Sequence, residues 1–395
     1  MILSHFTKIF RPRKQVIIKN YTKHCFQQPH KKALLYYKTD VFFDSALADR
    51  YTHTNNWEII CITQILNQLG FSIDIIDRSI SPEQLDQLPY NEYSLFLGLG
   101  AGNSGRYFER IAARLPKTLK IFYAAGPDPD QSNTWTLGRY DALIQRHPEA
   151  AGIKPRRTID FVKIKESMLV TDVIFCVGNA YTRATYDQYK KPIYPIRPSS
   201  SPLLSLSLSD LTSRQANHFL YFGGNGHIVK GLDLVIEAFQ ELPDQELFIC
   251  GPEEPEFETL YRIRSAPPKN IHWIGFVDVC GPTFREVTSH CSYIILPSCS
   301  EGIATSVTTC MRRGLIPIVT PETGIDTGSF GELVQNPYDK EQLKTRITAL
   351  SELPIAERTD RSIQTYLNSF QYTQGQFERD MTEGLVKALH TFGRI

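Results

Sequence analysis

The sequence predicts an α/β protein made of two domains, each built around a parallel β-sheet. Short apolar segments alternate with segments of helical spacing along most of the chain, which is typical of parallel sheets covered by helices on both faces. A chain of 395 residues is long enough for two cores, and the Ser-, Pro- and Leu-rich stretch after Pro198 indicates a linker between them. The expected parts are a basic N-terminal segment (1–30), a first α/β domain (31–198), the linker (199–210), a second α/β domain (211–375) and a final helix (376–395).

The composition argues against several classes of protein. The formal net charge of +1 gives no general attraction for nucleic acid. The eight cysteines lack the short paired spacing of zinc sites, and several lie in strand-like apolar runs, so we expect reduced, buried thiols and no bound metal. No apolar run approaches the ~20 residues of a membrane-spanning helix. We therefore expect a cytoplasmic protein without a cofactor.

Charge is nevertheless uneven at the N-terminus. Nine Lys and Arg residues precede the first acidic residue, Asp40, and apolar residues lie among them, namely Phe6, Ile9, Phe10, Ile17 and Ile18. Such a segment suits a peripheral contact with the inner face of an anionic membrane. A solvated tail in front of the first strand is the other interpretation.

The first domain is expected to begin with a strand, a helix and a second strand. Lys32 to Lys38 encloses a buried-strand pattern, the apolar spacing from Trp57 is helical as far as Gly70, and 72–77 is again apolar. His53 follows the first strand, where open parallel sheets place residues that contact ligands, although a loop histidine without a role is the interpretation we favour. Further strands are expected over 93–99, 119–124, 173–179 and 191–196, with helices before Leu115, between Thr136 and Met168, and over 180–189.

Residues 100–105 read Gly-Ala-Gly-Asn-Ser-Gly and match the GxGxxG pattern of dinucleotide-binding loops. That loop normally follows the first strand of its domain and is paired with an acid about 20 residues further on. Here it follows the third strand, so we interpret it as a loop that faces a cleft, with an NAD-dependent enzyme as a separate hypothesis. Asp128 and Asp130 follow the next strand, where they form either an acid/base pair or a solvated turn.

Two turns in the second domain carry the candidate site. Tyr221 to Gly231 passes from a strand through glycines into a helix, and Tyr293 to Gly302 passes from an apolar strand through Ser-Cys-Ser towards another helix. Small residues at a helix N-terminus leave N–H groups that attract anions. Lys230 adds a positive charge and Glu301 adds an acceptor for sugar hydroxyls, so the two turns predict a pocket for a phosphorylated sugar.

The two turns resemble the motifs of the group 1 (family four) class of retaining glycosyltransferases with the GT-B fold. In that class a glycine turn with Arg is followed by Lys-Gly, and a Pro-Ser-x-x-Glu-Gly turn opens a helix. Lys230-Gly231 and Pro297 to Gly302 match these motifs. The resemblance implies two Rossmann-like domains that face a cleft, an acceptor side in the first domain, a donor side in the second, and a final helix that crosses back to the first.

The resemblance also implies roles for individual residues. Lys230 corresponds to the Lys that holds the donor diphosphate, and Glu301 to the Glu that binds the donor sugar, so these two form the expected catalytic pair. The expected donor-binding residues are Gly223, Gly224, Asn225, Gly226, His227, Lys230, Ser300, Glu301, Gly302, Ile303, Thr305 and Thr309. Candidates on the acceptor side are His53, Asn103 and Asp128.

Two positions depart from the motifs of that class. Asn225 stands where the class has Arg, and Thr309 stands where it has a second Glu for the ribose of the nucleotide. Asn225 carries no charge, and Thr309 offers a ribose hydroxyl only a weak partner. His227, beside the turn, is the expected replacement donor of a hydrogen bond.

The sequence therefore predicts a hexosyltransferase-like glycosyltransferase of glycan biosynthesis. We expect a retaining, metal-independent enzyme that moves a sugar from a nucleotide-diphosphate donor to a saccharide or lipid-linked acceptor. The departures at Asn225 and Thr309 keep open a relative of the same fold that binds a nucleotide-sugar or glycan without turnover.

Overall fold

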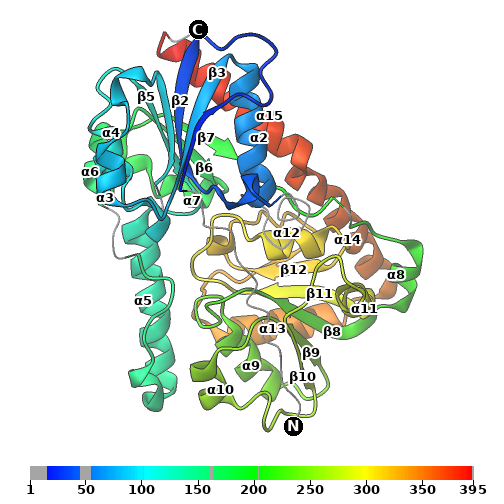
Figure 1. The fold of residues 1–395 in the computed structure, drawn as a ribbon. Coiled ribbons are helices and arrows are strands. Elements are labelled where there is room, and N and C mark those ends of the chain that lie inside the picture. The colour runs from blue at the N-terminus through cyan, green and yellow to red at the C-terminus, as the bar shows by residue number, and fades with distance from the viewer. Residues whose placement is uncertain (1–15, 45–54, 101, 160–162, 203, 394–395) are drawn as a thin grey trace, which may run out of the picture.

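The computed structural model describes residues 16–44, 55–100, 102–159, 163–202 and 204–393. Within these ranges the chain forms two α/β domains, which lie one above the other in Figure 1. The predicted fold class is confirmed. His53 and most of the basic N-terminal segment lie outside the described residues.

In the described part of the chain, the sheet of the first domain has seven strands in the order β1-β3-β2-β4-β5-β6-β7. The strands are β1 (Ile17–Tyr21), β2 (Lys31–Tyr37), β3 (Phe71–Asp77), β4 (Leu95–Leu99), β5 (Leu119–Ala124), β6 (Val173–Val177) and β7 (Ile193–Ile196). The helices are α2 (Asn55–Gln68), α3 (Pro82–Asp86), α4 (Phe108–Ala112), α5 (Pro129–Arg146), α6 (Ile164–Val170) and α7 (Ala180–Ala184). From β3 to β7 all neighbouring strands are parallel.

The edge strand β1 differs from the expectation for the basic segment. Ile17 and Ile18 pair antiparallel with Ile76 and Ile75 of β3. Both are half-buried and pack against the cores on either side of the sheet. These two residues are therefore part of the sheet, because their apolar side chains cover its edge, and they do not belong to a free amphipathic tail.

The second domain also has a parallel sheet, whose order among the described residues is β10-β9-β8-β11-β12-β13. The strands are β8 (Gln215–Phe222), β9 (Glu246–Cys250), β10 (Ile271–Gly275), β11 (Cys291–Leu296), β12 (Ile316–Val319) and β13 (Glu332–Leu333). The helices are α8 (Leu208–Ser213), α9 (Leu232–Gln240), α10 (Pro255–Tyr261), α11 (Pro282–His290), α12 (Thr305–Met311), α13 (Lys340–Ser351) and α14 (Ile355–Asn368). Because β8 and β11 are parallel neighbours, the turns that follow them lie at the same edge of the sheet.

Two helices connect the domains. The last helix, α15 (Gln374–Thr391), packs against α2 and β7 of the first domain, with Phe377 against Trp57 and Asp380 paired with Arg197 at 2.6 Å. In Figure 1, α5 leaves the first domain and runs beside the second. The helix α15, which follows the second domain, therefore packs against the first domain, and α5 of the first domain runs beside the second.

The stretch between the two sheets is packed into the protein. Ser199, Ser200 and Ser201 are buried, and the amide of Ser199 donates to the Glu58 carboxylate at 3.1 Å. The hydroxyl of Ser207 caps α8. This stretch was expected to be a linker between the domains, and the bond from Ser199 holds its beginning against α2 of the first domain.

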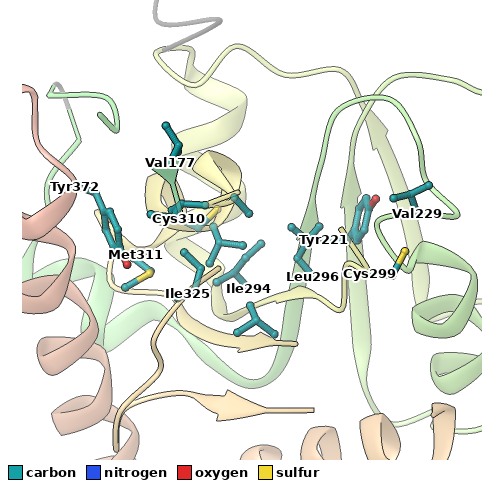
Figure 2. Packing of buried hydrophobic residues seen from close by; sticks show 14 of the residues in the cluster. Val177, Tyr221, Val229, Ile294, Leu296, Cys299, Cys310, Met311, Ile325 and Tyr372 are labelled. Carbon is teal, nitrogen blue, oxygen red and sulfur yellow. The ribbon is translucent and has the colours of Figure 1, made fainter. Parts of the chain in front are cut away.

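The apolar core is continuous from one domain to the other. Figure 2 shows Val177, at the end of β6, close to Cys310 of α12, with Ile325 and Tyr372 nearby. None of the helices in the described ranges is long and apolar enough to cross a membrane.

Candidate active site

A cavity of about 310 Å³ lies where the two domains meet. Most of its lining comes from loops at the carboxyl ends of the first sheet, from α5 and from the loop region after α5, and the rest comes from the two turns of the second domain. The lining residues are Gly102, Asn103, Ala125, Gly126, Pro127, Ser132, Thr136, Arg157, Thr158, Ile159, Val229, Ser300, Glu301 and Gly302. Ligands bind at this edge in open parallel sheets, so the cavity is the candidate active site.

Three charged side chains meet at the edge of this cavity, where Arg157 and Glu301 line it and Lys230 contacts Glu301. Arg157 of the first domain donates to both carboxylate oxygens of Glu301, with Nη1 to Oε1 at 2.8 Å and Nη2 to Oε2 at 3.3 Å. Lys230 Nζ also donates to Oε1 of Glu301. The side chain is 37% exposed for Arg157, 12% for Glu301 and 11% for Lys230. Two cations and one carboxylate leave a surplus positive charge at the cavity, which suits an anionic ligand.

The two turns are held together by their backbones. The carbonyl of Val229 accepts from the amide of Cys299 at 2.9 Å and from the hydroxyl of Ser298 at 3.2 Å. Gly231 has φ +79°, and a Cβ there would lie 2.5 Å from the carbonyl oxygen of Pro297. A side chain at Gly231 would therefore separate the turns, which explains why glycine follows Lys230.

Glu301 and Gly302 lie in close contact with the first domain. The amide of Glu301 donates to the carbonyl of Glu322 at 2.9 Å. A Cβ on Gly302 would lie 2.6 Å from the carbonyl oxygen of Val177 and 2.7 Å from that of Ala125. Ser300 Oγ lies 2.7 Å from Ser132 Oγ. The Glu-Gly turn therefore positions a carboxylate where the two domains touch.

The electrostatics keep Glu301 ionised. Burial opposes its ionisation, but Arg157 and Lys230 lower the pKa of Glu301 to about 2. The same pairing raises the pKa of Arg157. Burial lowers the pKa of Lys230, while Glu301 opposes that shift and Arg157 adds to it. At neutral pH the three groups therefore form a charged cluster that an anion can enter only by competing with Glu301.

The amides of the glycine turn are already used within the second domain. Those of Gly226 and His227 donate to the carboxylate of Glu254, and that of Gly223 donates to the carbonyl of Cys250 at 3.1 Å. The expectation that this turn offers open N–H groups to a phosphate is thus wrong for these three residues. Glu254 occupies the place that an anion would take.

His227 does not replace the missing arginine as expected. Its ring is fully buried, and Nε2 lies 2.7 Å from the carbonyl oxygen of Pro252. Phe257 and Trp273 contact the ring edge-on at 5.3 and 6.0 Å between centroids. The side chain points into the core of the second domain because these aromatic neighbours enclose it.

The remaining donor candidates fall into three groups, of which the first, Gly224 and Asn225, is exposed and is not among the residues that line the cavity. Ser300 and Gly302 line the cavity together with Glu301. Ile303 and Thr309 are buried, at 8% and 6% exposure, and Thr305 begins α12. Thr309 was expected at the pocket wall, but α12 turns it into the packed interior, so it is not among the residues that line this cavity.

Of the acceptor-side candidates, Asn103 lines the cavity and donates from Nδ2 to the carbonyl of Thr158 at 2.9 Å. Asp128 instead caps α5, where its carboxylate accepts from the amides of Asp130 and Gln131. Asp128 is 1% exposed and also accepts from the hydroxyl of Tyr189. Neither interpretation left open for Asp128 and Asp130, an acid/base pair or a solvated turn, describes the first carboxylate, because it is a buried helix cap.

Two further acids, Glu322 and Asp326, contact the first domain. Glu322 accepts from the hydroxyl of Tyr181 and Asp326 from the side-chain amide of Asn179, both at 2.9 Å. Both acids thus serve the contact between the domains.

Among the described residues there is no group of three or more His, Cys, Asp or Glu side chains that could hold a metal ion.

Sequence reasoning missed Arg157 as a member of the site. It is 144 positions from Glu301 and stands in a loop with several other basic residues, so no local pattern separates it from them. The fold alone brings it to the cavity.

Comparisons with known proteins concern the second domain and the fold of the whole chain. Residues 216–352 match the family model described as "Glycosyl transferases group 1". The matched stretch covers most of the second α/β domain, from β8 to α13, and contains both turns. No curated protein matches the chain.

Solved structures with the GT-B fold resemble the whole chain at low sequence identity. Sucrose-phosphate synthase from Thermosynechococcus elongatus has a TM-score of 0.62 at 11% identity and covers 91% of this chain and 100% of its own. The Anabaena protein HepE, in complex with UDP and glucose, has a TM-score of 0.57 at 12% identity, over 92% of this chain and 100% of its own. An α,α-trehalose-phosphate synthase (UDP-forming) from Burkholderia vietnamiensis has a TM-score of 0.57 at 11% identity, with 91% and 100% covered. These matches show the GT-B fold.

Proposed function

We propose that this chain is a retaining, metal-independent glycosyltransferase that moves a sugar from a nucleotide-diphosphate donor to a saccharide or lipid-linked acceptor. The observation that carries the proposal is the contact of Lys230 with Glu301, which lines the cavity between the domains. Both lie in the stretch that matches the glycosyltransferase group 1 family model. Since HepE is seen in complex with UDP and the Burkholderia vietnamiensis enzyme is UDP-forming, UDP-sugars are the first donors to test.

The residues of the cavity suit this chemistry. When the bond between sugar and phosphate breaks, negative charge builds on the departing diphosphate, and a cation already placed there stabilises it. Lys230 supplies such a charge without a metal ion. Glu301 accepts hydrogen bonds from the hydroxyls of the sugar and so fixes the anomeric carbon relative to the acceptor.

The acceptor is expected to enter from the first domain, where Asn103 lines the cavity. A lipid-linked acceptor would bring the protein to the inner face of the membrane, and the basic N-terminal segment would then contact anionic lipid. Sedimentation with vesicles of phosphatidylcholine and phosphatidylserine tests this part. Binding that needs phosphatidylserine and weakens with salt supports it, and equal binding to pure phosphatidylcholine contradicts it.

Release of nucleoside diphosphate from a panel of UDP-, GDP- and ADP-sugars tests the main proposal. We expect turnover of at least one donor, unchanged by EDTA, and a product with the anomeric configuration of the donor by NMR. Lys230→Ala should lower kcat/KM at least about 10-fold, because a charged hydrogen bond contributes about 1.5–3 kcal/mol. Lys340→Ala is the matched control, since Lys340 pairs with the exposed Glu241 on the surface.

The outcomes separate the proposal from its alternative. Binding of a nucleotide-sugar without release of the diphosphate would support the non-catalytic relative. Loss of activity in EDTA that added Mg²⁺ restores would contradict metal independence.

A further inference from the structure

The side chain of Arg157 lies near the glycine turn, where Asn225 supplies no positive charge. Asn225 is uncharged, and its neighbour Gly226 has φ +93°. A Cβ built on Gly226 would lie 2.7 Å from Cδ of Arg157 and 3.3 Å from its Cγ. The side chain of Arg157 therefore lies directly over Gly226, the residue that follows Asn225, although Arg157 belongs to the other domain.

The loop that carries Arg157 is held in place from several sides. Asn103 Nδ2 donates to the carbonyl of Thr158 at 2.9 Å, and Asn133 exchanges two hydrogen bonds with the backbone of Ile159, at 2.8 and 3.0 Å. The amide of Arg156 donates to the hydroxyl of Tyr140 at 3.0 Å. These contacts order the loop within the first domain, so the guanidinium of Arg157 is preorganised before a ligand binds.

The backbone of Arg157 supports the same point. Its φ of +66° lies in the left-handed region, which residues other than glycine adopt at a cost and mostly where surrounding contacts hold them. In this conformation the guanidinium reaches Glu301 across the cavity. The strained backbone therefore belongs to the residue whose side chain reaches from the first domain to the second.

We propose that Arg157 is the second cation for the donor diphosphate, supplied by the first domain in place of the charge that Asn225 does not carry. This inference rests on the proposed function. It places the two diphosphate cations on different domains, with Lys230 on the second and Arg157 on the first. The donor site is then complete only while the domains are closed on one another.

The ion pairs also suggest how the donor enters. In the structure both cations point at Glu301. A diphosphate placed between them would compete with that carboxylate for the same N–H groups. Glu301 would then be free to accept hydrogen bonds from the sugar, so that phosphate recognition prepares sugar recognition within one cluster.

Binding measurements on the whole protein test the inference. Titration calorimetry would use UDP, GDP, ADP and inorganic pyrophosphate, with uridine as a ligand without phosphate. We expect Arg157→Ala to weaken binding of the diphosphates and pyrophosphate about 10-fold or more, Arg157→Lys to weaken it less, and neither to change binding of uridine. Lys154→Ala removes an exposed charge from the same loop and serves as the control.

A rescue experiment distinguishes a ligand contact from a structural role. The double variant Arg157→Ala/Asn225→Arg returns a guanidinium to the turn from the second domain, and we expect it to recover most of the lost affinity. Recovery is not expected if Arg157→Ala acts by loosening the loop. Failure of the rescue, with thermal unfolding of the double variant unchanged from that of Arg157→Ala, would therefore overturn the inference.

The outcomes for the two proposals can be told apart. Sugar transfer by the native chain with equal diphosphate affinity in Arg157→Ala would overturn the inference and leave the proposed function standing. Tighter binding in Arg157→Ala would also overturn it, since Arg157 would then block the site. Pyrophosphate binding that depends on Arg157, without turnover of any donor, would support the inference and remove the transferase proposal.

Discussion

Two of the ion-pair groups where the domains meet differ in their access to water. In the first group, Arg139 and Arg146 of α5 face Asp233 of α9, at 3.7 and 2.6 Å. Arg139 and Asp233 are fully buried. In the second group, Arg157 and Lys230 face Glu301 at the rim of a cavity.

The difference indicates what each group can do. A buried pair cannot exchange its partner without leaving a charge in the interior, which costs several kcal/mol. The α5 pairs therefore hold the domains together. The pairs at Glu301 lie where a ligand can enter, so an anion can replace the carboxylate. Ion pairs of similar chemistry therefore stabilise the domain contact at α5 and form a candidate binding site at Glu301.

The largest expected effect is on the α5 pairs. Asp233→Ala leaves Arg139 buried without its carboxylate, so the free energy of unfolding should fall by about 3–5 kcal/mol. Urea unfolding followed by tryptophan fluorescence measures this. Glu241→Ala, just beyond α9, removes an exposed partner of Lys340 and Lys344 and should change stability little. Equal effects of the two substitutions would remove the contrast between buried and exposed pairs.

The next effect concerns the contact that positions Glu301. Gly302→Ala places a methyl group 2.6 Å from the carbonyl oxygen of Val177, so the two backbones must move apart. We expect a loss of about 1–3 kcal/mol in unfolding free energy, together with weaker donor binding. Gly375→Ala, where a Cβ would meet nothing within 4 Å, is the control. An unchanged stability of Gly302→Ala would mean that the domains are not closed at this point.

A smaller effect is expected when the carboxylate at the cavity is neutralised. Glu301→Gln should lower the unfolding free energy by about 1–2 kcal/mol, since Arg157 and Lys230 keep access to water in the cavity. Binding of the nucleoside diphosphate should be kept or improved, because the cations lose a competing partner. The preference for the nucleotide-sugar over the free diphosphate should disappear, and a retained preference would contradict the role of Glu301.

The smallest effect is a dependence on pH. Glu301 has a pKa lowered to about 2, so its ionisation stabilises the folded protein above the ordinary glutamate pKa, and this contribution is lost as pH falls from about 4.5 towards 2. The difference in stability between the native chain and Glu301→Gln should therefore shrink over that range. Urea midpoints at pH 7, 4 and 3 measure it. A difference that stays constant with pH would show that the carboxylate is not stabilised by the two cations.

The sequence contained several local signals that the structure bears out. Strands and helices alternate as expected, because apolar periodicity depends only on neighbouring residues. Lys230 and Glu301 could be singled out because each follows a strand and a turn of small residues. Asp128 had a local signal that was read wrongly, since Asp followed by Pro129 is typical of a helix start.

Other features depended on which segments meet in three dimensions. The side chain of His227 could not be placed from its neighbours in sequence, because Phe257 and Trp273 enclose it from other elements. Glu254 takes the amides of the glycine turn from a loop 28 positions away. Such contacts have no signature in a single sequence, since any of several acids could have taken the place.

The sequence by itself determined the α/β class, the order of the elements and the two turns that carry Lys230 and Glu301, because hydrophobic spacing and turn chemistry act over a few residues. Only the tertiary structure decided that Arg157 joins them. Its charge is one of several in a basic loop, and it becomes distinct only because the closed domains bring that loop over the glycine turn.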